Sequence, residues 1–282
     1  MTTLTLIETG GTICMTDGPD GLIPAPEKVA AALAQIAPGQ RLDHQKLEPL
    51  VDSADVGPLV WNRLLDRIDA APGPVIVTHG TDTMAFTGAA LDAALAGQGR
   101  CVVLTGSMHP LGVAGSDAEA NLALAIATAL GGKPGLHLAF NEESLPAGRV
   151  SKVNSTEAAA FAVTGTADLP EPSACRYDTS KSLGLVTLTP GLSQKGLGAM
   201  LDTFDGAVLR VFGAGTMPAT LAETLFARKG KPMIAVSQCA AGGLAPGSYA
   251  AGAALWAAGV ENGGQMSAEQ ALSRLWLRLS RA

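Results

Sequence analysis

Short apolar runs alternate with longer helix-like segments along the first half of the chain. The apolar runs predict strands at residues 4–8, 47–51, 75–77, 101–104 and 136–140, and the segments between them predict helices at 26–36, 58–68, 84–95 and 116–130. Such repeated alternation predicts a parallel sheet with helices on both faces. We therefore expect an α/β fold whose N-terminal domain is doubly wound.

The alternation restarts after a stretch rich in proline, serine and charge. Strands are predicted at residues 185–188, 207–211 and 233–237, and helices at 197–204, 218–228, 251–258 and 268–279. We expect an N-terminal α/β domain that carries the active site (1–164), a linker (165–183) and a smaller C-terminal α/β domain (184–282). The polar segment 149–156, with its alternating apolar positions, predicts a hairpin or an edge strand.

The composition narrows the class of protein. Of 282 residues, 47% are hydrophobic and 16% are charged, which is typical of a packed globular protein. The net charge of −6, without a basic patch, argues against nucleic acid as the main partner. No segment is long and apolar enough to span a membrane.

The N-terminus and the cysteines indicate a cytoplasmic protein. Residues 1–3 lead directly into the first strand without a targeting signal. The four cysteines are scattered and lack the spacing of metal ligands, so we expect reduced thiols and no metal site: Cys14, Cys101, Cys175 and Cys239.

Hydroxyl side chains follow four of the predicted strands, at Thr12, Ser53, Thr81 and Ser107. Right-handed crossovers bring the carboxyl ends of parallel strands to one edge of a sheet, where ligands bind in such folds. The two glycines before Thr12 allow a sharp turn and a close approach of a ligand. We expect these hydroxyl groups to converge on one site.

Thr12, Thr81, Asp82 and Lys152 together offer acyl-transfer chemistry. A threonine becomes a good nucleophile when a base removes its proton, and a buried lysine can be that base. A neighbouring carboxylate would hold the amine in place, so the set can replace serine, histidine and aspartate. Backbone N–H groups of the glycine turns could stabilise an oxyanion. The alternative interpretation leaves Lys152 in solvent and makes Asp82 the cap of the next helix.

Other features separate further possibilities. Neither a dinucleotide fingerprint nor a P-loop is present, which disfavours a nucleotide. No G-x-S-x-G nucleophile elbow is present either. His79 lacks a second ligand at metal-binding spacing, so a structural, hydrogen-bonded histidine is favoured. The loop at residues 13–23 is interpreted either as a mobile lid or as an ordinary surface connection.

Several motifs resemble those of the bacterial-type L-asparaginases, and the resemblance covers nearly the whole chain. The two signature motifs match Thr9-Gly10-Gly11-Thr12-Ile13 and Thr78-His79-Gly80-Thr81-Asp82-Thr83-Met84. Further matches are Thr105-Gly106-Ser107-Met108, Ser116-Asp117, Asn121-Leu122, Lys152 with Asn154, Thr189-Pro190-Gly191 and Gly213-Ala214-Gly215. The C-terminal pattern is more similar to the cytoplasmic branch of the family, at Ser237-Gln238-Cys239, Gly247-Ser248-Tyr249 and Gly259-Val260.

The resemblance implies a flavodoxin-like N-terminal domain and hydrolysis of L-asparagine to L-aspartate and ammonia, without metal or cofactor. It implies that Thr12 is the nucleophile of an acyl-enzyme, and that Thr81, Lys152 and Asp82 form a second triad. Ser53 would bind the substrate α-carboxylate and Asp82 the α-ammonium group. The substrate-binding residues it implies are Gly11, Ser53, Ala54, Gly80, Thr81, Asp82 and Ser107. A homodimer or homotetramer is implied, with the site completed across a subunit interface.

The chain departs from the family pattern at three places. Leu22 stands near the position of the usual lid tyrosine, so Tyr177 or Lys152 acting through Thr81 would have to assist the nucleophile. Ala54 replaces a common glutamine, and the C-terminal part differs at Thr216 and Gly247. These departures keep two alternatives open: an amidase for glutamine or an asparagine derivative, and a non-catalytic amino-acid-binding protein.

Overall fold

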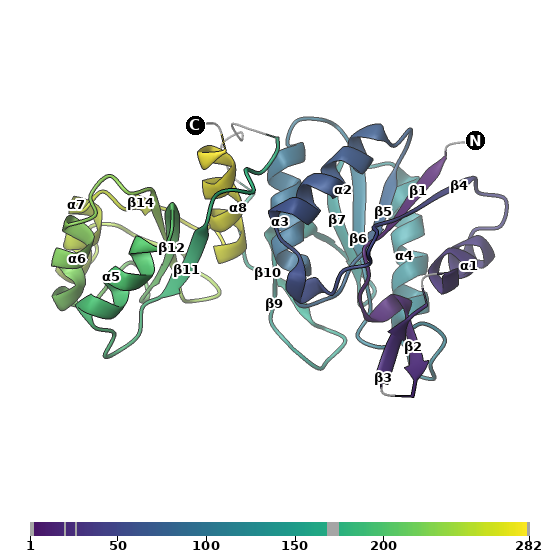
Figure 1. The fold of residues 1–282 in the computed structure, drawn as a ribbon, viewed down its shortest axis with the longest axis horizontal. Helices are drawn as coiled ribbons and strands as arrows, with labels where there is room; N and C mark the ends of the chain where they lie inside the picture. The colour runs from purple at the N-terminus through teal and green to yellow at the C-terminus, as the bar shows by residue number, and fades with distance from the viewer. Residues whose placement is uncertain (1–2, 20, 26, 168–174, 281–282) are drawn as a thin grey trace. The chain divides into compact units, whose positions relative to one another are not determined.

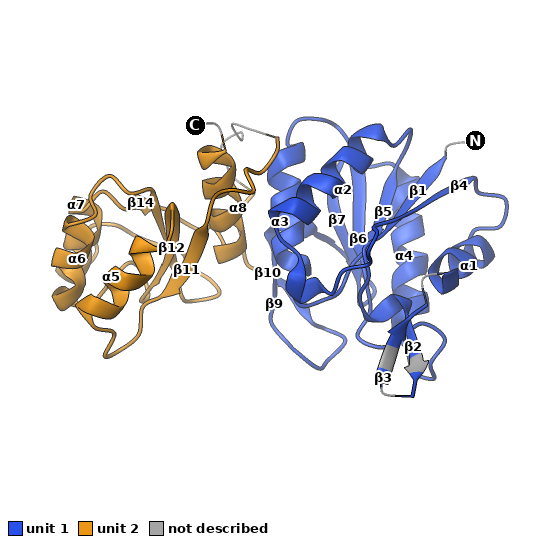
Figure 2. Ribbon diagram, in the orientation of Figure 1, with its two compact units in different colours: residues 1–163 blue, residues 164–282 orange. Residues whose placement is uncertain are grey.

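The computed structural model describes residues 3–19, 21–25, 27–167 and 175–280. The chain divides into two compact units, residues 1–163 and 164–282 (Figure 2). The predicted linker, residues 165–183, includes 168–174, which lie outside the described residues. Its limits, and those of the domains on either side of it, stay predictions.

A six-stranded sheet forms the centre of the first unit (Figure 1). In spatial order its strands are β4 (Leu42–Lys46), β1 (Leu4–Glu8), β5 (Val75–Thr78), β6 (Cys101–Thr105), β7 (Gly135–Phe140) and β8 (Glu143–Pro146). The first five are parallel, and β8 runs antiparallel to β7 at one edge. The parallel strands have the flavodoxin-like order 2-1-3-4-5, as predicted.

Helices cover both faces of this sheet. Helix α1 (Glu27–Ile36) and helix α4 (Ala118–Gly131) pack together on one face, over Leu4 and Leu6. Helix α2 (Pro58–Ala70) and helix α3 (Met84–Leu95) contact each other as a second pair. Because half of the α3 residues are alanine or glycine, the helix can pack closely, and nearly the whole of it is buried.

The second unit is a smaller α/β sandwich. Its parallel sheet has the order β11 (Leu183–Thr187), β12 (Gly206–Val211), β13 (Met233–Ser237) and β14 (Glu261–Asn262). One apolar cluster joins the sheet to α5 (Gln194–Asp202), α6 (Ala222–Phe226) and α7 (Ala253–Ala257), and a separate cluster joins it to α8 (Ala268–Leu279). Ser267 and Gln270 form a capping box that starts α8.

Two antiparallel hairpins and several short helical turns complete the described chain. Strand β9 (Val150–Lys152) pairs with β10 (Phe161–Val163), which confirms the hairpin predicted around residues 149–156. Strand β2 (Met15–Gly18) pairs with β3 (Gly21–Pro24) in the loop after Thr12. The 3-10 turns are η1 (Thr12–Cys14), η2 (Ser53–Asp55), η3 (Ala147–Arg149), η4 (Ala219–Leu221) and η5 (Ala250–Gly252).

Several predicted elements differ from the structure; the helix expected at 218–228, for example, is the turn η4 followed by the short helix α6. The strand expected at 47–51 is wrong, because the second strand is β4, directly upstream. All five β4 side chains are half-buried at the edge of the sheet, so this strand lacks the apolar pattern of its neighbours. The helix expected from Ser116 begins at Ala118, whose N–H donates to the Ser116 hydroxyl. Among the described helices, none combines the length and apolar character needed to cross a lipid bilayer.

Candidate active site

From β1 the chain continues to β4 on one side of it and then to β5 on the other side. The strand order therefore reverses between β1 and β5. In flavodoxin-like sheets, ligands bind outside the carboxyl ends of the strands at such a switch point. Thr12 follows β1 and is half-buried at the start of η1, while Thr81 follows β5. The topology therefore brings these two predicted residues to the same edge of the sheet.

The turns before Thr12 and Thr81 pack backbone against backbone. A Cβ atom at Gly11 would collide with the backbone nitrogen of Gly80, and one at Gly80 would lie 2.6 Å from the Ser53 hydroxyl oxygen. Gly11 also has a φ of +88°, which side chains rarely adopt. The absence of side chains at the two glycines lets the segments that carry Thr12, Ser53 and Thr81 meet.

Lys152 reaches this place from strand β9. Its Nζ donates to the Thr81 hydroxyl over 2.9 Å and to Oδ1 of Asp82 over 2.7 Å. The Lys152 side chain is 16% exposed, and that of Asp82 is 72% exposed. The alternative that leaves Lys152 in solvent is therefore wrong, and α3 is preceded by Thr83 rather than capped by Asp82.

A close approach of α3 and η3 explains how Lys152 comes to Thr81 from 71 positions along the chain. A Cβ atom at Gly88 would collide with the Ala147 carbonyl oxygen, so only glycine lets η3 lie this near the helix. Strand β9 continues directly from η3 and also packs against α3. In the sequence, the only indication of this close approach is the presence of a glycine, Gly88, inside a predicted helix.

Ser53 and Ala54 form a short turn beside this group. Ser53 is buried and its carbonyl accepts from the Thr83 hydroxyl over 2.5 Å, which ties the turn to the start of α3. The side chain of Asp52 accepts from the Ala54 N–H over 2.9 Å. Ala54 is exposed, and its methyl group offers no hydrogen bond to a ligand.

Ser107 lies on the loop after β6, at the same edge of the sheet. Its buried hydroxyl donates to the carbonyl of His109, so this hydroxyl is used within its own loop. The Asp117 carboxylate holds the loop by accepting from the N–H groups of Met108 and His109. We conclude that Ser107 is placed near the site but serves the loop conformation in this structure.

His79 is the centre of a buried hydrogen-bond chain. The Trp61 indole donates to the Thr87 hydroxyl over 3.2 Å, and that hydroxyl lies 2.9 Å from Nε2 of His79. Nδ1 lies 2.7 Å from the Gly80 carbonyl, which can only accept, so Nδ1 carries the proton. Burial lowers the pKa of His79 to about 4, so the ring is neutral at pH 7.

This arrangement confirms the structural interpretation of His79 and adds two residues to it. The chain of contacts fixes the Gly80 carbonyl, directly before Thr81. Trp61 and Thr87 were not predicted, because their helices read as ordinary apolar segments. In the sequence, the feature that could have indicated Trp61 and Thr87 is a polar group at a core-facing position of each helix, because buried polar groups need hydrogen-bond partners.

The loop after Thr12 is a short hairpin, β2–β3. Lys28 of α1 donates to the Thr16 hydroxyl over 2.9 Å, which ties the hairpin to the helix. The side chain of Leu22 lies outside what the structure describes, as does Pro26 at the predicted start of α1. Tyr177 is buried and belongs to the second unit.

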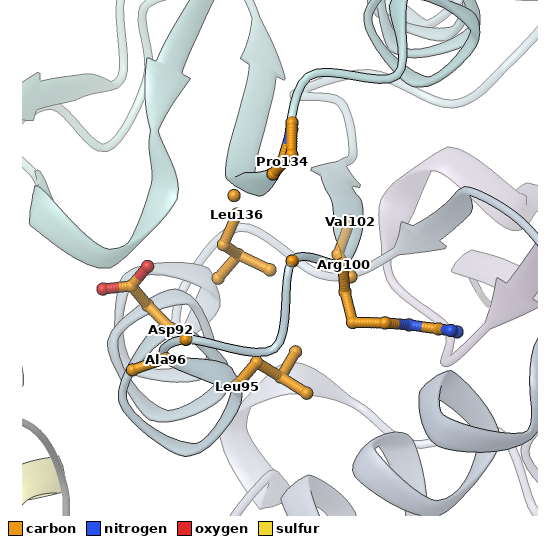
Figure 3. A pocket seen from close by; sticks show the side chains of 10 residues that line it. Asp92, Leu95, Ala96, Arg100, Val102, Pro134 and Leu136 are labelled. Atoms are coloured by element: carbon orange, nitrogen blue, oxygen red, sulfur yellow. The ribbon is translucent and has the colours of Figure 1, made fainter.

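A pocket of about 420 Å³ lies at the opposite edge of the first sheet, where β6 and β7 begin (Figure 3). Its wall includes Leu95, Val102 and Leu136, and none of the predicted site residues lines it. The Arg100 guanidinium donates to the carbonyls of Ile68 and Ala71, and its side chain extends away from Leu95 and Leu136. Among the described residues, no group of three potential metal ligands is found.

Comparisons with known proteins identify the family of the chain. Residues 3–178 match the family model described as "Asparaginase, N-terminal", and residues 183–282 match "Glutaminase/Asparaginase C-terminal domain". The chain is 32% identical to an L-asparaginase of Thermococcus kodakarensis, over 96% of this chain and 91% of that one. It is 31% identical to L-asparaginase 1 of Escherichia coli K12, over 96% and 90%.

The solved structures give the same result. The thermostable L-asparaginase from Thermococcus kodakarensis superposes with a TM-score of 0.84 at 30% identity, covering 99% of this chain and 93% of that one. L-asparaginase I from Vibrio cholerae gives a TM-score of 0.84 at 28% identity with the same coverage. The matched models span both units, and the matched proteins are covered almost completely. The chain belongs to the asparaginase family.

Proposed function

We propose that this protein hydrolyses L-asparagine to L-aspartate and ammonia through an acyl-enzyme on Thr12. The contact of Lys152 with both Thr81 and Asp82, 2.9 Å and 2.7 Å away, carries the proposal. An amine that contacts a hydroxyl and a carboxylate is the arrangement expected of a base that moves a proton for acyl transfer. The family membership of the chain supports the same chemistry.

In the first half of the reaction, the Thr12 oxygen attacks the side-chain amide carbon of asparagine. The Thr12 proton passes to the leaving nitrogen, so the C–N bond breaks and ammonia departs. In the second half, water attacks the ester carbonyl, and its proton passes through Thr81 to Lys152. The C–O bond to Thr12 then breaks, and Lys152 returns the same proton through Thr81 to the Thr12 oxygen. Aspartate leaves with a carboxylic acid that ionises in water.

Substrate binding is assigned to the residues around the meeting glycines. Asp82, with its largely exposed carboxylate, would pair with the α-ammonium group, and Ser53 would bind the α-carboxylate. The N–H groups of Gly11 and Gly80 lie in the turns that face each other, where they would support the substrate and the developing oxyanion. Ala54 and Ser107 contribute to the walls of the site.

Ammonia release from asparagine tests the proposal. The wild-type protein should show multiple turnovers, Thr12→Ala should reduce kcat to background, and Lys152→Met should lower kcat/KM by about a thousandfold. Thr189→Ala, in the second unit, provides a folded control that keeps its rate. Wild-type turnover that survives both substitutions would remove Thr12 and Lys152 from the mechanism, and binding without turnover would favour the amino-acid-binding protein.

A second candidate is an amidase for glutamine or a larger asparagine derivative. The exposed methyl group of Ala54 favours it, because this position cannot hydrogen-bond the substrate amine and leaves room beside it. A panel of amides compared by kcat/KM decides between the two. A strong preference for asparagine over glutamine and over N-substituted asparagines would exclude this candidate.

The proposal includes a homo-oligomer, either a dimer or a tetramer, that acts in the cytoplasm without a cofactor. The resemblance to the cytoplasmic branch of the family supports this part of it. The four cysteines are free, which fits a reducing compartment. Light scattering of the purified protein gives the oligomer size directly.

A further inference from the structure

Glu8, the last residue of β1, is the one carboxylic side chain that the described part of the protein buries completely. It stands four positions before Thr12 and takes no part in the chemistry proposed above. A carboxylic acid in such a place needs either a charge partner or a bound proton. Its surroundings show which of the two it has.

Strand geometry directs Glu8 toward the segment that carries Thr12. Leu4, Leu6 and Glu8 alternate onto the same face of β1, and the apolar cluster on that face also contains Ile13 and Cys14 of η1. Burial, with the Glu8 charge adding to it, raises the pKa of the Cys14 thiol to about 12. Cys14 in turn donates to the Gly11 carbonyl from both its N–H and its thiol, over 3.2 Å and 3.1 Å.

The nearest titratable partner of Glu8 is His44 on the neighbouring strand β4. Nε2 of His44 lies 2.8 Å from Oε1 of Glu8. The orientation is not that of a well-formed hydrogen bond, and in the described part of the chain neither atom, nor Oε2 of Glu8, has another partner. Lys46 lies opposite Glu8 in the strand register, but its Nζ contacts Glu27 at the start of α1.

Burial favours the neutral form of Glu8. Burial raises the pKa of Glu8 to about 8; Lys46 opposes this and Glu27 adds to it. Burial also lowers the pKa of His44, as does the Lys46 charge. At pH 7 the pair is therefore a carboxylic acid beside a neutral imidazole, with one proton between them.

We propose that Glu8 is a positioning residue. Its protonated carboxyl group, paired with His44, packs against the Gly11–Cys14 segment and holds it in place, which fixes the position of Thr12. The inference rests on the proposed role of Thr12. The protonated acid lies beside the neutral imidazole of His44, so it adds no net charge to the apolar cluster that contains Cys14. Loss of that proton would leave an unpaired anion in an apolar cluster, and the Gly11–Cys14 segment would have to rearrange.

The pH dependence follows from the direction of the shift. The unfolded protein loses the Glu8 proton near pH 4.5 and the folded protein near pH 8. The contribution of this proton to stability is complete below the lower value and is lost as the pH rises through the upper one. Activity should fall together with it, by about tenfold per pH unit above the folded pKa, because only the protonated form supports Thr12.

Glu8→Gln, which is neutral at every pH and of equal size, tests the proposal against Glu27→Gln as the control. Glu27 is exposed and shares Lys46 with the buried site. The wild type should lose kcat above pH 8 with little change in KM. Glu27→Gln should show the same kind of loss at a lower pH, because the Glu27 charge helps to raise the pKa of Glu8, whereas Glu8→Gln should keep its kcat. The proposal is overturned if Glu8→Gln shows the same alkaline loss as the wild type.

A second measurement needs neither a variant nor catalysis. Carbon-13 NMR of the wild-type protein, labelled at the glutamate carboxyl groups, should give a Glu8 midpoint near pH 8, and the amide signals of Thr12 and Cys14 should shift with it. A Glu8 midpoint near its ordinary value, or amide signals that ignore the titration, overturns the proposal. If no ammonia is released from asparagine while the coupled midpoint is found, the proposed function is at fault and the positioning role of Glu8 stands.

Discussion

A side chain at Gly11 would collide with the backbone nitrogen of Gly80, so the turns that follow β1 and β5 are in direct backbone contact. This contact places Thr12 beside the segment of Thr81, Asp82 and their partner Lys152. Residues from three separate parts of the chain thereby share one edge of the sheet.

Gly11→Ala should lower kcat by about a hundredfold, because the added methyl group has to push the two turns apart. Gly39→Ala is the matched control: Gly39 has a φ of +86° against +88° for Gly11, but its added methyl group would meet open space. Both variants should lose about 1 kcal/mol from backbone strain. Equal activity in the two variants, measured with thermal unfolding alongside, would contradict the close packing.

Asp82→Asn should lower kcat/KM by about a hundredfold and leave the melting temperature almost unchanged. The Asp82 carboxylate is 72% exposed, and exposed ion pairs contribute less than about 1 kcal/mol to stability. Asp202→Asn breaks a comparable pair with Arg228 in the second unit, where Asp202 is 62% exposed, and should keep full activity. A melting temperature that falls sharply with Asp82→Asn alone would show that the pair is mainly structural.

Thr87→Val should destabilise the protein by about 1–3 kcal/mol, because it removes the buried hydroxyl group that contacts the Trp61 N–H and Nε2 of His79. It should also lower kcat through the Gly80 carbonyl that His79 holds. Thr87→Ser retains the hydroxyl group and should restore most of both properties. Denaturant unfolding and ammonia release check the pair, and equal stability of the two variants would refute the role of the hydroxyl.

Acid should destabilise the protein through His79. The pKa of His79 is about 4 in the folded protein and 6.5 in the unfolded chain. Between these two values the unfolded chain binds a proton at His79 and the folded protein does not. The contribution is complete above the unfolded value and is lost as the pH falls toward 4, by about 3 kcal/mol in total. His79→Gln should flatten the stability profile in this window, whereas His109→Gln, at an exposed histidine, should leave it as in the wild type. An unchanged slope in His79→Gln would contradict the buried neutral ring.

Much of this arrangement can be predicted from local sequence patterns. The limits of α3 and α8 and the ends of β1 and β5 follow from apolar patterning, and the strand ends carry Thr12 and Thr81. Parallel topology then places both residues at one edge of the sheet. For these residues the periodicity of the chain and the handedness of its connections are sufficient.

Other parts depend on contacts that a local pattern does not contain. Strand β4 lies at the sheet edge, and its mixture of half-buried residues gives no strand signal. The place of Lys152 depends on Gly88 admitting η3, and the environment of Glu8 depends on His44 of a strand that was not predicted. From the sequence alone, a glutamate at the end of an apolar strand is expected to face solvent. Its burial becomes evident only when the neighbouring strands and helices are known.

The central claim is that Thr81 and Lys152 act as one catalytic unit, and a double-mutant cycle in kcat/KM for asparagine tests it most directly. Thr81→Val and Lys152→Met should each lower kcat/KM by about a thousandfold, and the double variant should be no slower than the slower single variant. Melting temperatures establish that all three variants are folded. Losses that multiply in the double variant would show that the two side chains act independently, and would contradict the account.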